Sequence, residues 1–238
     1  MSFGEKYEEK ITKSKKISLL LNSPLLSINV SSRKKNIINE ITIFLNNKVE
    51  KKIIVKKIIL ACGGIENSRI LLWSKIKNNI ENLSNSPIGE YWSDHPGGPV
   101  GQLITKERIF KNYFEEKIFE PKNSYLKENN LNNMRIRFIK TYESTNKIDQ
   151  SLKDLLCFYP NVGKKFFETI QNKRMLYCNY VISFSAEQKP IKENKVYLSK
   201  NKDSLGIPKV NIKWEIRNDV YDSLEFVLKD FGKELINI

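Results

Sequence analysis

The chain is poor in residues that several common kinds of site require. Its 238 residues include ten Gly, three Cys, two Ala and one His. The Cys residues, Cys62, Cys157 and Cys178, lie far apart and form no Cys-x-x-Cys motif, so a structural zinc site is not expected. The glycines include no Gly-x-Gly-x-x-Gly, the turn that usually holds the pyrophosphate of a dinucleotide.

Long apolar runs are also missing. No stretch of about 18 apolar residues occurs, so we expect no membrane-spanning helix. The N-terminus has no apolar segment behind a basic start, so we expect no secretory signal. An odd number of scattered Cys residues fits a reducing compartment, and these observations together predict a cytoplasmic protein.

Positive charge is in excess. The sequence has 41 Lys and Arg residues against 27 Asp and Glu, a formal net charge of +14. Only seven of the basic residues are Arg, while Asn and Ile reach 26 and 30. Lys, Asn and Ile have A/T-rich codons, so base composition explains the charge more simply than an anion-binding surface does. Nucleic-acid sites favour the planar fork of Arg; we therefore expect neither nucleic acid nor membrane as a partner.

The first third of the chain predicts strands followed by a helix. Three β-like runs cover residues 16–30, 37–45 and 51–62, with turn-rich separators between them. The third run becomes continuously apolar at its end, which is typical of a strand entering a core that is buried on both faces. Gly63-Gly64 ends this strand, and residues 66–75 are expected to form a helix.

The remainder predicts a mixed, less regular region after a Gly- and Pro-rich loop at residues 82–101. We expect strands at 134–142 and 173–186, a strand pair at 195–198 and 209–216, and helices at 148–159, 162–171 and from Asn218 to about 235. The pattern as a whole indicates an α+β fold.

The paired glycines are the most informative feature for function. They follow the predicted buried strand in Leu60-Ala61-Cys62-Gly63-Gly64-Ile65-Glu66-Asn67-Ser68-Arg69. Two residues without Cβ atoms let a flat or charged ligand approach the main chain closely. The helix that follows offers free N–H groups, which suit a phosphate or an electron-rich ring. A purely structural strand–helix connection has the same sequence signature, so this motif alone does not decide between the two.

Three ordered motifs resemble the glucose-methanol-choline (GMC) family of FAD-dependent oxidoreductases. The first is Ala61-Cys62-Gly63-Gly64-Ile65-Glu66 with Arg69-Ile70-Leu71-Leu72. The second is Ile88-Gly89-Glu90 with Asp94-His95-Pro96. The third is Glu187-Gln188-Lys189-Pro190 with Asn194-Lys195-Val196-Tyr197-Leu198 and Asp203-Ser204-Leu205-Gly206-Ile207-Pro208.

This resemblance implies a fold and an activity. It implies a partial FAD-binding domain at 1–98, part of a substrate domain at 99–190, and the start of a C-terminal oxidoreductase region at 191–238. Family members take hydride from CH–OH groups of alcohols or sugars. The positions that the resemblance implies for FAD binding are Leu25, Ala61, Gly63, Gly64, Asp94 and His95. No residue is assigned as catalytic and no metal is implied.

Two parts of the family pattern are missing from this sequence: the Gly-x-Gly-x-x-Gly unit and the segment that carries the catalytic His. The resemblance therefore implies an internal fragment that is inactive alone and needs the missing N- and C-terminal segments in trans. Two alternatives stay open. In the first, the chain is a non-catalytic remnant that binds a sugar or a protein. In the second, it is a basic protein that binds nucleic acid or a membrane surface.

Overall fold

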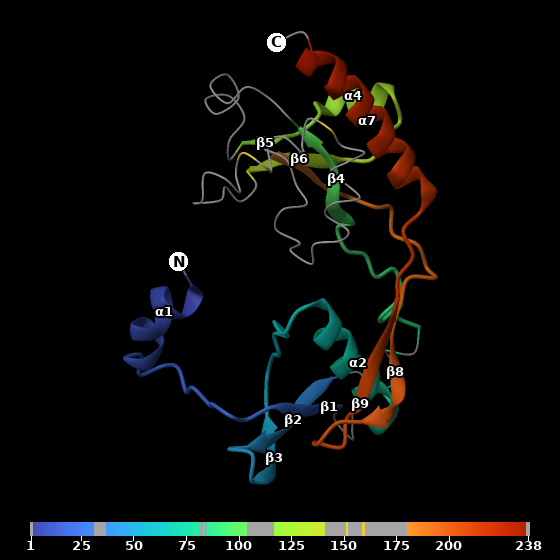
Figure 1. The fold of residues 1–238 in the computed structure, drawn as a ribbon. Helices are drawn as coiled ribbons and strands as arrows, with labels where there is room; N and C mark the ends of the chain where they lie inside the picture. The colour runs from blue at the N-terminus through green and yellow to red at the C-terminus, as the bar shows by residue number, and fades with distance from the viewer. Residues whose placement is uncertain are drawn as a thin grey trace. The chain divides into compact units, whose positions relative to one another are not determined.

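The computed structural model describes residues 2–30, 37–80, 83, 85–103, 117–140, 151, 159 and 180–236. Helices and antiparallel sheets are mixed, so the fold is α+β. The chain forms two compact units, residues 1–92 with 190–214 and residues 93–189 with 215–238 (Figure 1). The three functional divisions implied by the resemblance stay predictions. Within the described residues, no helix is both long and apolar enough to cross a membrane.

The first unit contains a three-stranded meander and a two-stranded hairpin. Its elements are α1 (Phe3–Thr12), β1 (Leu25–Val30), β2 (Ile38–Leu45), β3 (Val49–Ile54), α2 (Gly64–Asn78), β8 (Lys195–Lys202) and β9 (Pro208–Lys213). The meander has the order β1-β2-β3 and is antiparallel throughout. Ile28 and Ile43 are buried on one face of the meander, whereas its other face carries polar side chains, as alternation along a strand requires.

Helix α2 protects the free edge of the meander. The side chains of Ser74 and Asn78 lie one turn apart on the helix, so they project in the same direction. Ser74 Oγ accepts a hydrogen bond from the N–H of Ile28 at 2.9 Å, and Asn78 Nδ2 donates to the carbonyl of Ile28 at 2.7 Å. Both backbone groups that Ile28 presents at the edge of β1 are thereby paired, which blocks strand addition at this edge.

The hairpin β8–β9 contacts the same helix α2. Gly89 allows the loop that contains it to lie close to β8. Gly89 has φ +79°, and its carbonyl accepts a hydrogen bond from the N–H of Val196 at 2.7 Å. A Cβ atom at Gly89 would lie 2.2 Å from the Val196 carbonyl oxygen. Glycine is therefore required here by the backbone conformation and by the closeness of β8.

The second unit is a sheet covered by a helix. Its elements are β4 (Gly97–Leu103), β5 (Ile118–Phe119), α4 (Asn123–Glu128), β6 (Met134–Lys140), β7 (Tyr180–Ala186) and α7 (Asn218–Ile236), with the strand order β4-β7-β6-β5. The core consists of Met134, Ile136 and Ala186 from the sheet and Val220, Leu224 and Val227 from α7. These helix positions follow the spacing of a single apolar face, as the sequence predicted.

The third predicted strand, over residues 51–62, is confirmed only in its first part, and the burial expected for its end was wrong. Strand β3 ends at Ile54, and residues 55–62 belong to no strand. Ile54 and Ile59 are 83% and 90% exposed. An apolar run becomes a buried strand only if other strands pair with it; beyond Val55, whose N–H donates to the carbonyl of Asn39 on β2, no described strand pairs with residues 56–62.

Other expectations had mixed outcomes. Residues 16–24 are not a strand, because β1 begins only at Leu25, and the N-terminal region forms α1 with a capping box between Ser2 and Glu5. The helix predicted at 66–75 is confirmed and extends over Gly64–Asn78. The strand pair and the last helix are also confirmed. The helices expected at 148–159 and 162–171 lie almost wholly outside the described residues.

Candidate functional site

The turn before α2 is open, as a ligand-binding turn requires. Gly63 has φ +85° and is the N-cap of α2, and no side chain caps this helix end. A Cβ atom at Gly63 or at Gly64 would meet no atom within 4 Å. The N–H groups of Gly64, Ile65 and Glu66 belong to the first turn of the helix, where intrahelical acceptors are lacking. The turn thus offers bare main chain and a positive helix end.

Asn67 holds the segment that leads into this turn. Its side-chain Oδ1 accepts from the N–H of Cys62 at 3.0 Å, and its Nδ2 donates to the carbonyl of Leu60 at 3.3 Å. The N–H of Asn67 also donates to the carbonyl of Gly63 at 2.9 Å. The Asn67 side chain, on the helix after the turn, therefore holds the segment that precedes the turn in place. Ala61 and Cys62 in that segment stay exposed.

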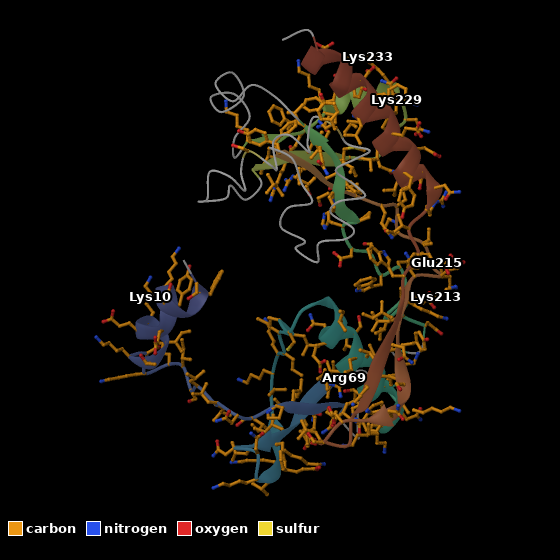
Figure 2. The ribbon with its side chains drawn as sticks, in the orientation of Figure 1. Lys10, Arg69, Lys213, Glu215, Lys229 and Lys233 are labelled. Atoms are coloured by element: carbon orange, nitrogen blue, oxygen red, sulfur yellow. The ribbon has the colours of Figure 1, made fainter. Side chains whose placement is uncertain are left out.

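Arg69 connects α2 to the β8–β9 loop (Figure 2). Its Nε donates to the carbonyl of Pro208 at 2.7 Å, and its Nη2 donates to the Asp203 carboxylate at 2.5 Å and to the carbonyl of Ile207 at 3.2 Å. Its Nη1 pairs with Glu66 at 3.1 Å. All three guanidinium nitrogens are thus used within the protein, so Arg69 is a structural residue and not a cofactor ligand.

Arg69 and Asp203 each stabilise the charged form of the other. Burial works to lower the pKa of Arg69, but the hydrogen bond to Asp203 and the attraction of Glu66 and Asp203 outweigh it, so the pKa is raised. Burial likewise works to raise the pKa of Asp203. The hydrogen bond from Arg69 and those from the N–H groups of Ile207 and Leu205 outweigh that effect, and the pKa of Asp203 is lowered. Both groups are therefore charged at neutral pH.

The remaining sequence-predicted site residues lie at separate places. Leu25 is the half-buried first residue of β1 and pairs with Ile43. Asp94 and His95 belong to the second unit, just before β4, and both are exposed. The N–H of His95 donates to Asp94 Oδ1 at 2.8 Å, which is a local turn contact. The described structure brings Ala61, Gly63 and Gly64 together at one turn; Leu25 belongs to β1, and Asp94 and His95 belong to the second unit.

Sequence reasoning missed a polar cluster on the open face of the meander. It is made of Ser27 and Asn29 on β1 and Glu40 and Thr42 on β2. The strand register places Ser27 opposite Thr42 and Asn29 opposite Glu40. The signal was present in the sequence as polar residues two apart in both strands, a spacing that puts them on one face. It becomes visible only when the register between the strands is known.

The comparisons with known proteins do not identify a family. No protein-family model matches the chain, and no curated protein matches it. The resemblance to the GMC oxidoreductases therefore rests on the three ordered motifs alone.

Proposed function

We propose that this chain is part of an FAD-dependent oxidoreductase of the GMC type, which acts on CH–OH groups of an alcohol or a sugar. The observation that carries the proposal is the open Gly63–Gly64 turn at the start of α2. Its main chain is free of side-chain cover, and no protein atom lies within 4 Å of either missing Cβ. A flavin dinucleotide requires such close access to the main chain.

The residues present fit one part of a cofactor site. Gly63 and Gly64 would hold FAD through their main chain, with Ala61 beside them and Leu25 offering its backbone to the adenine. Asp94 and His95 would line the passage toward the substrate region. When bound, the flavin supplies the oxidising power by accepting hydride from the alcohol carbon. The residues of this chain bind and orient the cofactor, and none of them is assigned as the base.

A second polypeptide segment is part of the proposal. The sequence has no Gly-x-Gly-x-x-Gly cradle for the pyrophosphate. Ile54 at the end of β3 and Ile59 beyond it are exposed, and among the described residues no hydrogen bond is found for the N–H groups of residues 56–59. A strand that pairs along residues 56–59 would satisfy these groups and cover this apolar surface. We propose that the segment carrying the pyrophosphate cradle supplies that strand.

Co-expression tests this proposal directly. The chain is co-expressed with the coding sequences on either side of its own, purified through a tag on this chain, and examined for bound flavin by its absorbance. We expect flavin to purify with the complex and the isolated chain to retain none. A complex that assembles without flavin, or an isolated chain that is stable and loaded with FAD, contradicts the proposal.

Gly64→Ala separates cofactor binding from folding. Gly64 does not have a positive φ, and a Cβ there meets no protein atom. Alanine in a helix is more favourable than glycine by up to about 1 kcal/mol, so the variant should fold at least as well as the parent chain. It should nevertheless lose flavin, because the new methyl group occupies the space of the ligand. Gly232→Ala, a helical glycine in α7 with equally open surroundings, is the matched control and should keep flavin.

A further inference from the structure

We propose that the polar face of the meander holds a second ligand site, one that binds a small neutral polyhydroxyl compound such as a monosaccharide. A cavity of about 580 Å³ lies on this face beside the end of α2. That volume falls within the range of about 300–1,000 Å³ that is usual for small-molecule sites. Its lining residues are Ser27, Asn29, Val30, Glu40, Thr42, Glu50, Lys52, Lys77 and Asn78.

The floor of this cavity is buried and polar. Ser27 is 1% exposed and Thr42 is 5% exposed. Asn29, two residues after Ser27 on β1, uses all of its side-chain hydrogen-bonding groups within the protein. Its Nδ2 donates to Glu40 Oε1 at 2.8 Å and to Thr42 Oγ1 at 3.0 Å, and its Oδ1 accepts from Asn78 Nδ2 at 2.7 Å. Asn29 is therefore a positioning residue that holds its neighbours in place for a ligand.

The neighbours of Asn29 keep unused hydrogen-bonding capacity. The hydroxyl of Thr42 accepts from Asn29 and can still donate its own proton. Asn78 donates both amide hydrogens, to Ile28 and to Asn29, and its carbonyl oxygen accepts no hydrogen bond within the described residues. Glu40 is held through Oε1 by Asn29 and Lys52, which leaves its second oxygen as an acceptor. Within the described residues, these three neighbours of Asn29 thus offer one free donor, the Thr42 hydroxyl, and two free acceptors, the side-chain oxygen of Asn78 and the second carboxylate oxygen of Glu40.

The charges around the cavity favour a neutral ligand. Two carboxylates, Glu40 and Glu50, face two ammonium groups, Lys52 and Lys77, so the lining has no net charge. The pKa of Glu40 is lowered by the hydrogen bonds from Asn29 and Lys52, which keeps this carboxylate ionised as an acceptor. Because the opposite charges offset each other, neither an anion nor a cation gains a net electrostatic attraction here. A ligand whose hydroxyl groups both donate and accept matches this mixture.

Tryptophan fluorescence reports on this cavity. Lys77 Nζ lies 5.9 Å from the centre of the Trp73 ring. A ligand that engages Lys77 moves its charge relative to that ring and changes the emission. The full chain is titrated with glucose and with sorbitol, at concentrations up to about 100 mM because single-site sugar affinities are commonly weak. Glucose 6-phosphate and glycine serve as the anionic and zwitterionic probes. No flavin is needed, so the result is independent of the proposed oxidoreductase activity.

We expect saturable binding of the neutral compounds and weaker binding of the charged ones. Thr42→Val removes one hydroxyl at constant shape and should weaken binding about tenfold, as the loss of a buried hydrogen bond does. Thr12→Val, the same change on α1, is the control and should leave binding unchanged. If Thr42→Val impairs folding, Glu50→Gln at the exposed rim replaces it, with an expected loss of about threefold or more. No saturable response, a preference for the charged probes, or equal binding by the cavity variant and its control each overturns the proposal.

Discussion

Replacing Arg69 should destabilise the first unit far more than replacing an exposed arginine. Arg69 is only 14% exposed, and its guanidinium joins α2 to the loop between β8 and β9. Arg69→Met keeps the aliphatic bulk but removes the charge and every hydrogen bond. The Pro208 carbonyl then loses the Arg69 donor, the Ile207 carbonyl keeps only the N–H of Asp203, and the Asp203 carboxylate, 25% exposed, loses its counter-charge.

The size of the effect follows from the burial of the groups left behind. Breaking a fully buried ion pair costs about 3–5 kcal/mol, whereas an exposed pair contributes about 0.2–1 kcal/mol. The pair of Arg69 and Asp203 lies between these limits, and Asp203 keeps two backbone N–H donors, from Leu205 and Ile207. We therefore expect Arg69→Met to cost about 2–4 kcal/mol. Arg69→Lys keeps the charge but loses the planar guanidinium that donates in several directions at once. It should lower the free energy of unfolding by about 1–2 kcal/mol.

Urea unfolding followed by tryptophan fluorescence measures this effect selectively. All three Trp residues, Trp73, Trp92 and Trp214, belong to the first unit. The control is Arg135→Lys in the second unit, where the ion pair with Glu120 is 58% and 49% exposed on its two sides; its unfolding is followed by circular dichroism, because this unit contains no Trp. That change should cost less than about 0.5 kcal/mol. Equal unfolding midpoints for Arg69→Met and the parent chain would refute the assigned role of Arg69.

The ion pair of Arg69 and Asp203 also predicts that the stability of the first unit declines at low pH. The pKa of Asp203 is lowered from its ordinary value of 3.8, so the folded state releases this proton more readily than the unfolded state. Its contribution to stability is present above about pH 4 and is lost as the pH falls through the lowered folded-state pKa. Asp203→Asn should flatten the decline of the urea midpoint below about pH 4. If the urea midpoint of Asp203→Asn falls with pH as in the parent chain, a carboxylate other than Asp203 causes the decline.

Two further predictions concern other sites. Gly89→Ala places a Cβ 2.2 Å from the carbonyl oxygen of Val196 at a positive φ, and should lower the stability of the first unit by more than about 2 kcal/mol, measured as the urea midpoint; an unshifted midpoint would contradict the assigned contact. Tyr125 donates to Asp230 at 2.9 Å, and burial followed by that hydrogen bond raises its pKa to about 12. Its contribution is complete below about pH 10 and is lost between about pH 10 and 12, so Tyr125→Phe should remove this alkaline decline when unfolding is followed by circular dichroism.

The sequence by itself determined the elements whose patterns are local. The apolar spacing after Asn218 predicted a helix, and the helix following Gly63-Gly64 was also predicted correctly. The hairpin at residues 195–213 was predicted from two β-rich runs around a turn-forming segment. Each of these depends on interactions between residues close in the chain, and side-chain periodicity reports those directly.

Only the tertiary structure decided what lies beside these elements. The run from Ile58 to Ala61 has the composition of a buried strand, yet burial depends on partner strands that composition does not supply. Arg69 and Asp203 are 134 positions apart, so their pairing leaves no local pattern. The polar cluster around Asn29 likewise depends on the register of β1 against β2. Contacts between distant residues need the folded chain to bring them together, because the sequence pattern specifies a face but not the group that the face will meet.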